Sequence, residues 1–138
     1  RIRFMEKDDT GLKTIRRAVR ALQVVARDEN AEQSGREVAL NALVDFAANF
    51  SEVAPDIIKT MAPLIPHPEI GYHTRNCLEG ISRRIFWESA TTFIITALVA
   101  AFKTTGDQDI RTGIISSLAA IAREKESVTD TASRSYLD

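Results

Sequence analysis

Three side chains that could do chemistry recur at four-residue steps in the middle of the sequence. Glu69, His73 and Cys77 share one stripe of any continuous helix, because residues four apart lie on the same face. With His67 nearby, they offer oxygen, nitrogen and sulfur donors, which are the ligand types of zinc. A structural zinc site needs four well-placed ligands, and Cys77 is the single cysteine of the chain. We therefore interpret Cys77 as a small buried apolar side chain, and we expect no metal site and no cofactor.

The same residues could also form a nucleophile and its base. In that arrangement His73 would activate the Cys77 thiol, but the sequence supplies no third orienting group and no glycine turn for an oxyanion. Phosphate-binding loop, HExxH and GxSxG patterns do not occur in the sequence. We therefore expect no enzymatic activity, and we expect His73 to face solvent.

A second set of candidate residues is basic and lies near the start of the chain. On a helix these side chains lie largely opposite Leu12, Ile15 and Val19, and we call them the basic ridge. Its members are Lys13, Arg16, Arg17, Arg20 and Arg27. One interpretation is a solvated helix face. The others are a contact for an acidic protein, for anionic lipid or for nucleic-acid phosphates.

Charge is unevenly distributed, although the net charge is −1. Residues 1–27 hold eight lysines or arginines against three acidic residues, whereas residues 28–58 hold seven acidic residues against Arg36 alone. Neighbouring helices of opposite charge can complement each other, or the two faces can steer a charged partner. Nucleic acid is disfavoured because no aromatic residues alternate with the arginines. We expect a protein partner, with an acidic protein preferred at the basic ridge, and the oligomeric state stays open.

The composition is that of a single globular domain. Of 138 residues, 44% are apolar and 27% are charged, with only six glycines and four prolines. One cysteine excludes an internal disulfide, which fits a reducing compartment and predicts a cytoplasmic location. The opening RIRFMEKDD has no apolar signal-peptide region, and the missing initiator methionine leads us to expect a segment before Arg1. Such a segment leaves open an association with membranes through residues outside this sequence.

Apolar residues spaced by three or four predict an all-α fold of about six helices. The predicted ranges are 12–28, 34–50, 55–64, 69–84, 88–104 and 107–126. Thr10 is predicted to cap the first helix, and Ser34 with Glu37 forms a capping-box pattern at the second. Residues 1–126 are predicted to form one domain, followed by a flexible or partly ordered tail at 127–138.

Periodicity also predicts which side chains face the core. The positions predicted to face inward are Leu12, Ile15, Val19, Leu22, Val25, Ala26, Ala39, Leu40, Leu43, Phe46, Ala47, Phe50, Ile70, Cys77, Leu78, Ile81, Ile85, Ile110, Ile114, Ile115, Leu118, Ile121 and Ala122. Arg75, Glu79, Arg83 and Arg84 are predicted to face outward.

The uncharged run SATTFIITALVAAF at residues 89–102 has two interpretations. A membrane span needs about 20 consecutive apolar residues, whereas a run of about 10 to 14 is typical of a buried helix. Charged Arg83, Arg84 and Glu88 lie close before this run. We therefore predict a central buried helix and no transmembrane span in this chain.

The sequence repeats with a nearly constant step. When Leu43, Ile81 and Leu118 are matched, the steps between them are 38 and 37 residues, and Arg36 then aligns with Arg111. A step below about 40 residues that contains a helix, a turn and a helix is typical of stacked helical hairpins. Each hairpin would cover the apolar face that its neighbour leaves exposed.

These repeats resemble those of HEAT and armadillo-like proteins. The resemblance covers residues 34–126 and rests on SGREVALNALVDFA, IGYHTRNCLEGISRRI and DQDIRTGIISSLAAIA. It implies a short right-handed α-solenoid of antiparallel helix pairs that binds partners and does not catalyse reactions. We therefore predict a noncatalytic protein–protein interaction scaffold. The alternative is a cytosolic regulatory or assembly module of a larger membrane-associated or multidomain protein.

Overall fold

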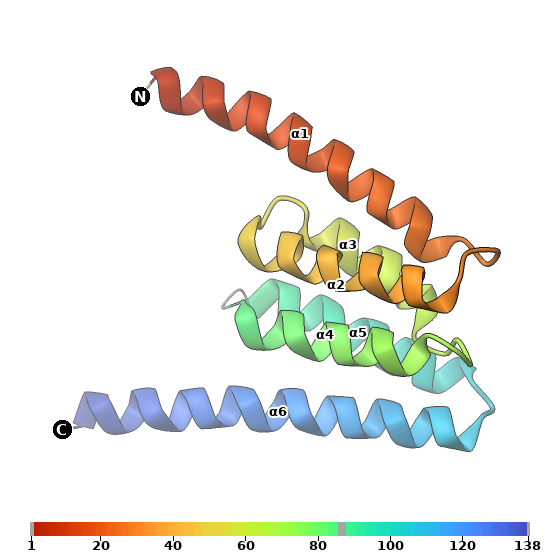
Figure 1. Ribbon diagram of the computed structural model, residues 1–138. Coiled ribbons are helices and arrows are strands. Elements are labelled where there is room, and N and C mark those ends of the chain that lie inside the picture. The colour runs from red at the N-terminus through yellow and green to blue at the C-terminus, as the bar shows by residue number, and fades with distance from the viewer. Residues whose placement is uncertain (1, 86–87, 138) are drawn as a thin grey trace.

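A computed structural model describes residues 2–85 and 88–137, and side chains within 10–85 and 88–126. Its elements are α1 (Ile2–Arg27), α2 (Gln33–Asn49), α3 (Ala54–Met61), the 3-10 turn η1 (Ala62–Leu64), α4 (Gly71–Arg84), α5 (Glu88–Thr104) and α6 (Gln108–Leu137) (Figure 1). No strand occurs in these two ranges, so the predicted all-α fold is confirmed.

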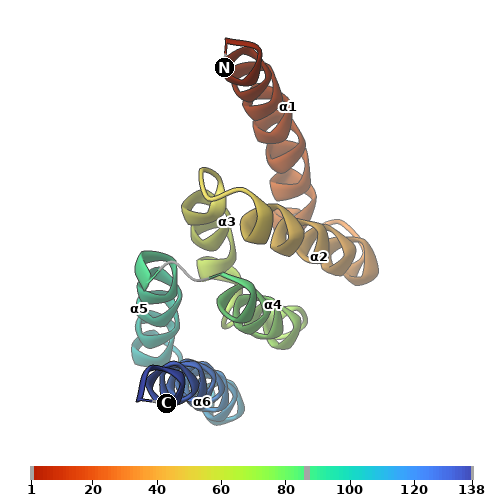
Figure 2. The ribbon, with the colours of Figure 1, turned by 90° about the vertical axis from the view of Figure 1, so that its left-hand side faces the viewer.

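The helices are arranged in tiers from α1 at one end to α6 at the other (Figure 1). When the helices are seen nearly end-on, α2, α4 and α6 form one row, and α3 and α5 lie beside that row (Figure 2). Within the rows α2 packs on α4, α4 packs on α6, and α3 packs on α5. Helix α1 packs mainly on α2 and also contacts α3.

Helix lengths differ from prediction at the two outer helices. Helix α5 has the predicted bounds, whereas α1 begins at Ile2 and α6 continues to Leu137, through the segment predicted as a tail. A single glycine such as Gly11 costs a helix only about 1 kcal/mol, and residues 127–137 contain neither glycine nor proline. The predicted cap at Thr10 is wrong, because Thr10 lies inside α1 and its carbonyl accepts a hydrogen bond from Thr14 Oγ1.

The predicted capping box at α2 is also wrong. Glu32 is the residue that precedes the helix, it makes no side-chain capping bond, and Ser34 already lies in the first turn. Glu37 instead accepts a hydrogen bond from Gln33 Nε2 at 2.8 Å. At α6 Asp107 caps the helix, since its Oδ1 accepts the backbone N–H groups of Asp109 and Ile110.

Most positions predicted to face inward do so. Leu40, Leu43, Leu78, Ile81 and Ile114 are fully buried in one apolar core that runs through all tiers. The prediction is wrong at Val25, Ile115 and Ala122, which are exposed because they point away from the neighbouring helices. The prediction of a central buried helix at residues 88–104 is wrong as well, because Phe93 of α5 is 53% exposed and Ile95 is 39% exposed.

Arg75 was predicted to face outward and is buried. Its Nη1 donates a hydrogen bond to the Ile65 carbonyl at 3.1 Å, and its guanidinium lies against Gly113 of α6, where the lack of a Cβ leaves room. Arg36 is buried in the same way and donates from Nε to the Ala26 carbonyl at 2.9 Å. Each arginine thus reaches a carbonyl ten residues earlier in the chain, at the turn that leads into its own helix.

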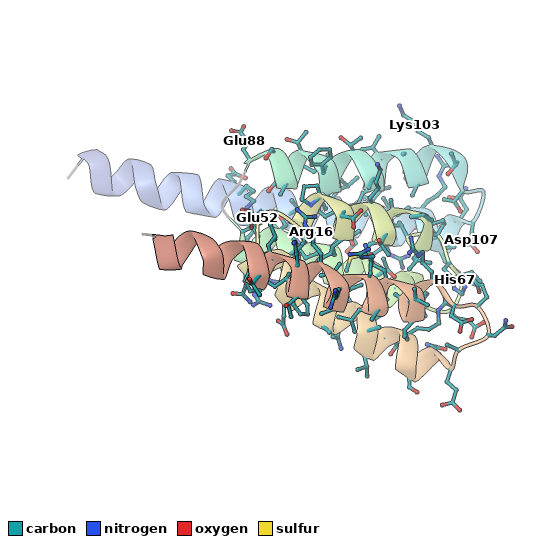
Figure 3. The ribbon with its side chains drawn as sticks, turned by 90° about the horizontal axis from the view of Figure 1, so that it is seen from above. Arg16, Glu52, His67, Glu88, Lys103 and Asp107 are labelled. Carbon is teal, nitrogen blue, oxygen red and sulfur yellow. The ribbon has the colours of Figure 1, made fainter. Side chains whose placement is uncertain are left out.

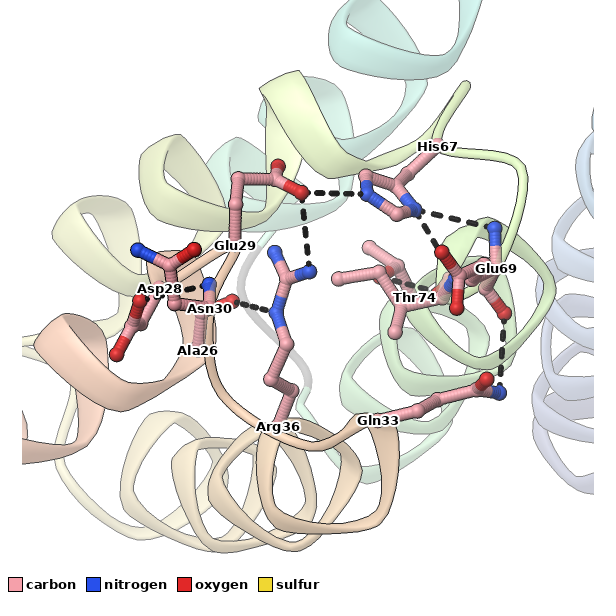
Figure 4. Close-up of polar contacts among 10 residues, drawn as sticks. Ala26, Asp28, Glu29, Asn30, Gln33, Arg36, His67, Glu69 and Thr74 are labelled. Carbon is pink, nitrogen blue, oxygen red and sulfur yellow. Dashed lines mark hydrogen bonds and ion pairs between the residues drawn. The ribbon is translucent and has the colours of Figure 1, made fainter.

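A polar cluster ties the turn after α1 to the turn before α4 (Figure 4). Glu29 Oε2 lies 3.1 Å from His67 Nε2 and 3.4 Å from Arg36 Nη1. His67 Nδ1 accepts the backbone N–H groups of Glu69 and Ile70, so Nε2 of the neutral ring carries the hydrogen that Glu29 accepts. One histidine therefore fixes the turn before α4 with one ring nitrogen and joins it to the turn after α1 with the other.

The ionised form of Glu29 should contribute stability that is lost in acid. The hydrogen bond from His67 lowers the pKa of Glu29 from its ordinary value of 4.5, and Arg36 also lowers it, against an opposing effect of desolvation. A carboxyl whose pKa is lower in the folded state stabilises that state above its unfolded pKa and loses this contribution as the pH falls. We expect Glu29→Gln to be less stable than wild type at about pH 6, with the gap shrinking toward about pH 3.5.

Urea unfolding of both proteins at the two pH values measures this gap. Exposed Glu126 provides the matched control, Glu126→Gln, which should track wild type at both pH values. A Glu29→Gln deficit that stays constant with pH would contradict the role assigned to the carboxylate.

Candidate functional site

The residues first considered for metal binding do not converge. Within the described part of the chain, no three His, Cys, Asp or Glu side chains are grouped so that they could hold a metal ion. His67 is engaged by Glu29, and His73 Nε2 lies 2.8 Å from Asn41 Oδ1 on α2. His73 is therefore half-buried against α2, whereas the sequence predicted that it would face solvent.

Cys77 also points toward Asn41, and its surroundings do not favour a nucleophile. The thiol donates a weak hydrogen bond to Asn41 Oδ1 at 3.7 Å. Burial raises the pKa of the Cys77 thiol to about 12, with a smaller contribution from the charge of Glu37. The amide oxygen of Asn41 can only accept, so His73 Nε2 donates to it and cannot take a proton from the thiol in this arrangement. The thiol therefore stays protonated at neutral pH.

The basic ridge lies on the exposed side of α1. Lys13, Arg16, Arg17, Arg20 and Arg27 are all exposed. Arg16 and Arg20 border a small hollow of about 150 Å³ that they share with Val19, Val53 and Asp56. The guanidinium of Arg20 donates a hydrogen bond from Nε to the Arg16 carbonyl at 3.5 Å. This carbonyl is neutral, so the positive charge of Arg20 is not compensated by it.

A concave feature lies between α3 and α5, and we call it the α3–α5 groove. Its main hollow measures about 480 Å³, and a second hollow of about 270 Å³ adjoins it and shares Pro55 and Phe93. The main hollow is lined by Glu52, Pro55, Asp56, Ile58, Lys59, Ala62, Phe93, Thr96, Ala97 and Ala100. Its floor is mostly apolar, and its edges carry charge.

Small side chains at helical spacing create this groove. On α5 the stripe that faces it is Phe93, Thr96, Ala97 and Ala100. On the opposite side it includes Pro55 of α3 and Ala62 of η1. Alanine and proline cannot fill the space between two helices that larger residues would close. Phe93 is the one large side chain of the α5 stripe, and it stands at the junction of the two hollows.

Sequence reasoning missed this groove. The uncharged run at 89–102 predicts a central buried helix, but only Ala90, Thr91, Ile94, Leu98 and Ala101 of α5 are buried. The available signal was the sequence of small residues one helical turn apart after Phe93, which provides too little volume for a close-packed interface.

Gln23 is a second residue that periodicity did not single out. It lies in α1, is 4% exposed, and donates from Nε2 to Asp56 Oδ2 at 3.0 Å and to Thr60 Oγ1 at 2.8 Å. Thr60 Oγ1 donates to the Asp56 carbonyl at 3.1 Å. These bonds connect α1 to α3 and fix Asp56 at the edge shared by the groove and the hollow beside the basic ridge.

Helices of the described ranges are each too short or too polar to cross a lipid bilayer.

Comparison of the chain with models of protein families, with curated proteins and with solved structures finds no match in any of the three. The candidate site therefore rests on its geometry: an apolar groove of about 480 Å³ between two helices, next to an exposed basic ridge.

Proposed function

We propose that this protein is a noncatalytic interaction scaffold, a short α-solenoid of HEAT-like helix pairs that binds a protein segment in the α3–α5 groove. The pairs would be α2 with α3 and α4 with α5, stacked between α1 and α6. The two rows of helices in Figure 2 support this arrangement. A chain that stacks like units presents a continuous groove along one row of helices, which suits the capture of elongated partners.

Hydrogen bonds between the tiers support a repeating unit. Ten described residue pairs from neighbouring tiers are joined by side-chain hydrogen bonds. Six of them are separated by 36 to 39 residues, which brackets the steps of 38 and 37 found in the sequence, and the other four are separated by 32, 33, 40 and 43 residues. The six pairs at 36 to 39 residues are Gln23 and Thr60, Glu29 and His67, Gln33 and Glu69, Asn41 and Cys77, Asp45 and Arg84, and Glu79 and Ser117.

The observation that carries the proposal is the exposure of apolar surface in the groove. Phe93 is 53% exposed, although a phenylalanine loses about 1.5 to 3 kcal/mol when its side chain stays in water instead of being buried. The hollow beside it falls within the range of about 300 to 1,000 Å³ that is typical of ligand sites. A partner that covers Phe93 recovers the share of this energy that belongs to the exposed half of the side chain. The basic ridge nearby offers a second contact to an acidic segment of the same partner.

A selection of displayed random peptides on the immobilised protein tests this function. We expect selected peptides to shift the NMR signals of α3 and α5 and to lose at least about tenfold in affinity with Phe93→Ala, because an aromatic side chain at the centre of an interface dominates binding. Ala100→Phe, which fills the groove, should weaken binding as well. Tyr72→Ala is the matched control, since Tyr72 is 72% exposed on α4 and does not line the groove.

Selected peptides that bind equally well to wild type, Phe93→Ala and Ala100→Phe would contradict the groove as the binding site. Both variants should keep the helical circular dichroism of wild type, because both positions are exposed.

A further inference from the structure

The α3–α5 groove is elongated. Its two hollows follow α5 from Ser89 to Ala100 and follow α3 and η1 from Ser51 to Ala62. The eleven residue steps from Ser89 to Ala100 on α5 correspond to about 17 Å, or about three helical turns. A compact ligand would use one hollow, whereas a rod three turns long would use both and would pass over Phe93 at their junction.

Charged residues polarise the groove along its length. Glu52 lies two residues before the start of α3, and Glu88 is the first residue of α5. Lys59 and Lys103 lie in the last turns of the same two helices. Figure 3 shows Glu52 and Glu88 on the side where α3 and α5 begin, and Lys103 at the opposite end of α5, so α3 and α5 run in the same direction. One end of the groove is therefore acidic and the other is basic.

None of the four charges at the ends is neutralised by a described neighbour. All four side chains are exposed, and the described residues form no ion pair with any of them. Asp56 is different, because Gln23 engages its carboxylate and Arg16 and Arg20 border its far side. Glu52 and Lys59 line the main hollow itself. Glu88 and Lys103 line neither hollow, but Glu88 directly precedes the lining residue Ser89, and Lys103 follows the lining residue Ala100 by three positions on α5. The polarity that a ligand meets thus comes from Glu52 in the groove with Glu88 just outside it, and from Lys59 in the groove with Lys103 just outside it.

We propose that the groove binds an amphipathic α-helix of about three turns whose N-terminal turn is acidic and whose C-terminal turn is basic, lying antiparallel to α3 and α5. This inference rests on the proposed function and names the partner's chemistry. The apolar stripe of the ligand helix covers Phe93, Ile58 and the small residues of α5. Its basic turn lies over Glu52 and Glu88, and its acidic turn lies over Lys59 and Lys103.

Electrostatics select the antiparallel orientation. A helix is most stable when acidic residues are in its first turn and basic residues in its last, because these charges complement its macrodipole. A ligand of that kind meets opposite charges at both ends of the groove only if its C-terminus lies at the beginnings of α3 and α5. In this orientation the dipole of the ligand helix is also antiparallel to the dipoles of α3 and α5, which is the favourable arrangement for neighbouring helices. Glu88 and Lys103 complement the dipole of α5 in the same way, and their outward charge remains available to a ligand.

Synthetic helical peptides of 16 residues test the charge order. Each carries leucines at positions i, i+3, i+7 and i+10 and a side-chain staple on its polar face. One peptide has glutamates in the first turn and lysines in the last, and its matched control has the two sets exchanged. We expect the first peptide to bind about tenfold more tightly at low salt, since four exposed charge pairs each contribute a small amount. About 1 M salt should remove most of the difference.

Charge reversal of the groove should reverse the preference. In the variant Glu52→Lys, Glu88→Lys, Lys59→Glu, Lys103→Glu, the exchanged peptide should bind more tightly than the original. All four positions are exposed, and circular dichroism checks that the helices remain. The control variant carries Phe93→Ala alone and should weaken both peptides without changing their order.

Disulfide capture determines the orientation of the bound helix. Ser89→Cys and Thr104→Cys place a thiol at either end of α5 on exposed positions, while the buried Cys77 stays protonated and unreactive. A peptide with an activated C-terminal cysteine should couple to Ser89→Cys, and one with an activated N-terminal cysteine should couple to Thr104→Cys. The opposite pattern of coupling would overturn the antiparallel orientation.

Several outcomes would overturn the inference while the proposed function stands. These are peptides that depend on Phe93 but show no charge-order preference, selected ligands that bind in an extended form, and binding only of neutral lipid vesicles or small apolar molecules. Self-association of the protein that Phe93→Ala abolishes would assign the groove to a second copy and would overturn it as well. If no peptide is found whose binding to wild type depends on Phe93, the proposed function itself is contradicted.

Discussion

Replacing Leu78 with alanine should lower the free energy of unfolding by about 2 to 5 kcal/mol. Leu78 is fully buried on α4, the helix that packs on both α2 and α6 and also contacts α5 and α3. Removing its isobutyl group leaves a cavity at a point where several helices meet, and none of them can close it without losing its own contacts. Urea unfolding followed by circular dichroism at 222 nm measures the change.

Ile115→Ala is the matched control for Leu78→Ala. Ile115 lies 37 residues after Leu78, at the corresponding position of the repeat, but it is 53% exposed on α6. Its replacement should change the free energy of unfolding by no more than about 0.5 kcal/mol, because little packing is lost and alanine favours the helix. Equal losses in the two variants would show that burial in α4 differs from the structure described.

Gly113→Ala should destabilise the protein, although alanine is the better helix former. A Cβ at position 113 would lie 2.7 Å from Arg75 Nη2 and 2.9 Å from Arg75 Cζ and Nε. The guanidinium would have to move from a site where it is 8% exposed and bonded to the Ile65 carbonyl. Burial already lowers the pKa of Arg75, against the opposing charge of Glu79, so the group has little hydration to replace that bond. We expect a loss of about 1 to 3 kcal/mol.

A second substitution makes this explanation specific. In an Arg75→Met background the space beside Gly113 is no longer needed, and Gly113→Ala should then stabilise the protein by up to about 1 kcal/mol. This reversal of sign corresponds to a coupling energy of about 2 kcal/mol between the two positions in a double-mutant cycle. Gly11→Ala on α1 is the control, since a Cβ there meets nothing within 4 Å and should stabilise the helix in either background. Additive effects of Gly113→Ala and Arg75→Met would exclude the contact as the cause.

The stability of the tiers and the proposed binding site depend on different faces of the same helices. On α5, Ile94 and Leu98 are fully buried in the core, while Phe93 and Ala100 face the groove. Substitutions at the groove face should therefore change binding without unfolding the protein, and substitutions such as Leu78→Ala should unfold it without altering the chemistry of the groove. This separation makes the proposed function testable with folded variants.

Helix positions were predictable because they depend on local sequence. Apolar residues at three- and four-residue spacing, interrupted by SEVAP, by PLIPHP and by TTGDQ, predicted the bounds of α2, α4 and α5 to within two residues. The helix predicted at 55–64 is divided into α3, which ends at Met61, and η1, which continues to Leu64. The side chains with the clearest periodicity, Leu43, Ile81 and Ile114, are buried as expected. The caps predicted at Thr10 and Ser34 were wrong, because a side-chain hydroxyl is compatible with several local hydrogen-bonding patterns.

The sequence by itself determined an all-helical chain, the bounds of its inner helices and the apolar stripe that each helix turns to the core, because these depend on neighbours three and four residues apart. Only the tertiary structure decided that Arg75 is buried against Gly113, that Ile115 is exposed where Leu78 is not, and that the uncharged face of α5 borders a groove. Burial depends on which helix covers a face and on the volume of residues distant in the chain. Periodicity reports that a face is apolar, and it does not report whether another helix covers that face.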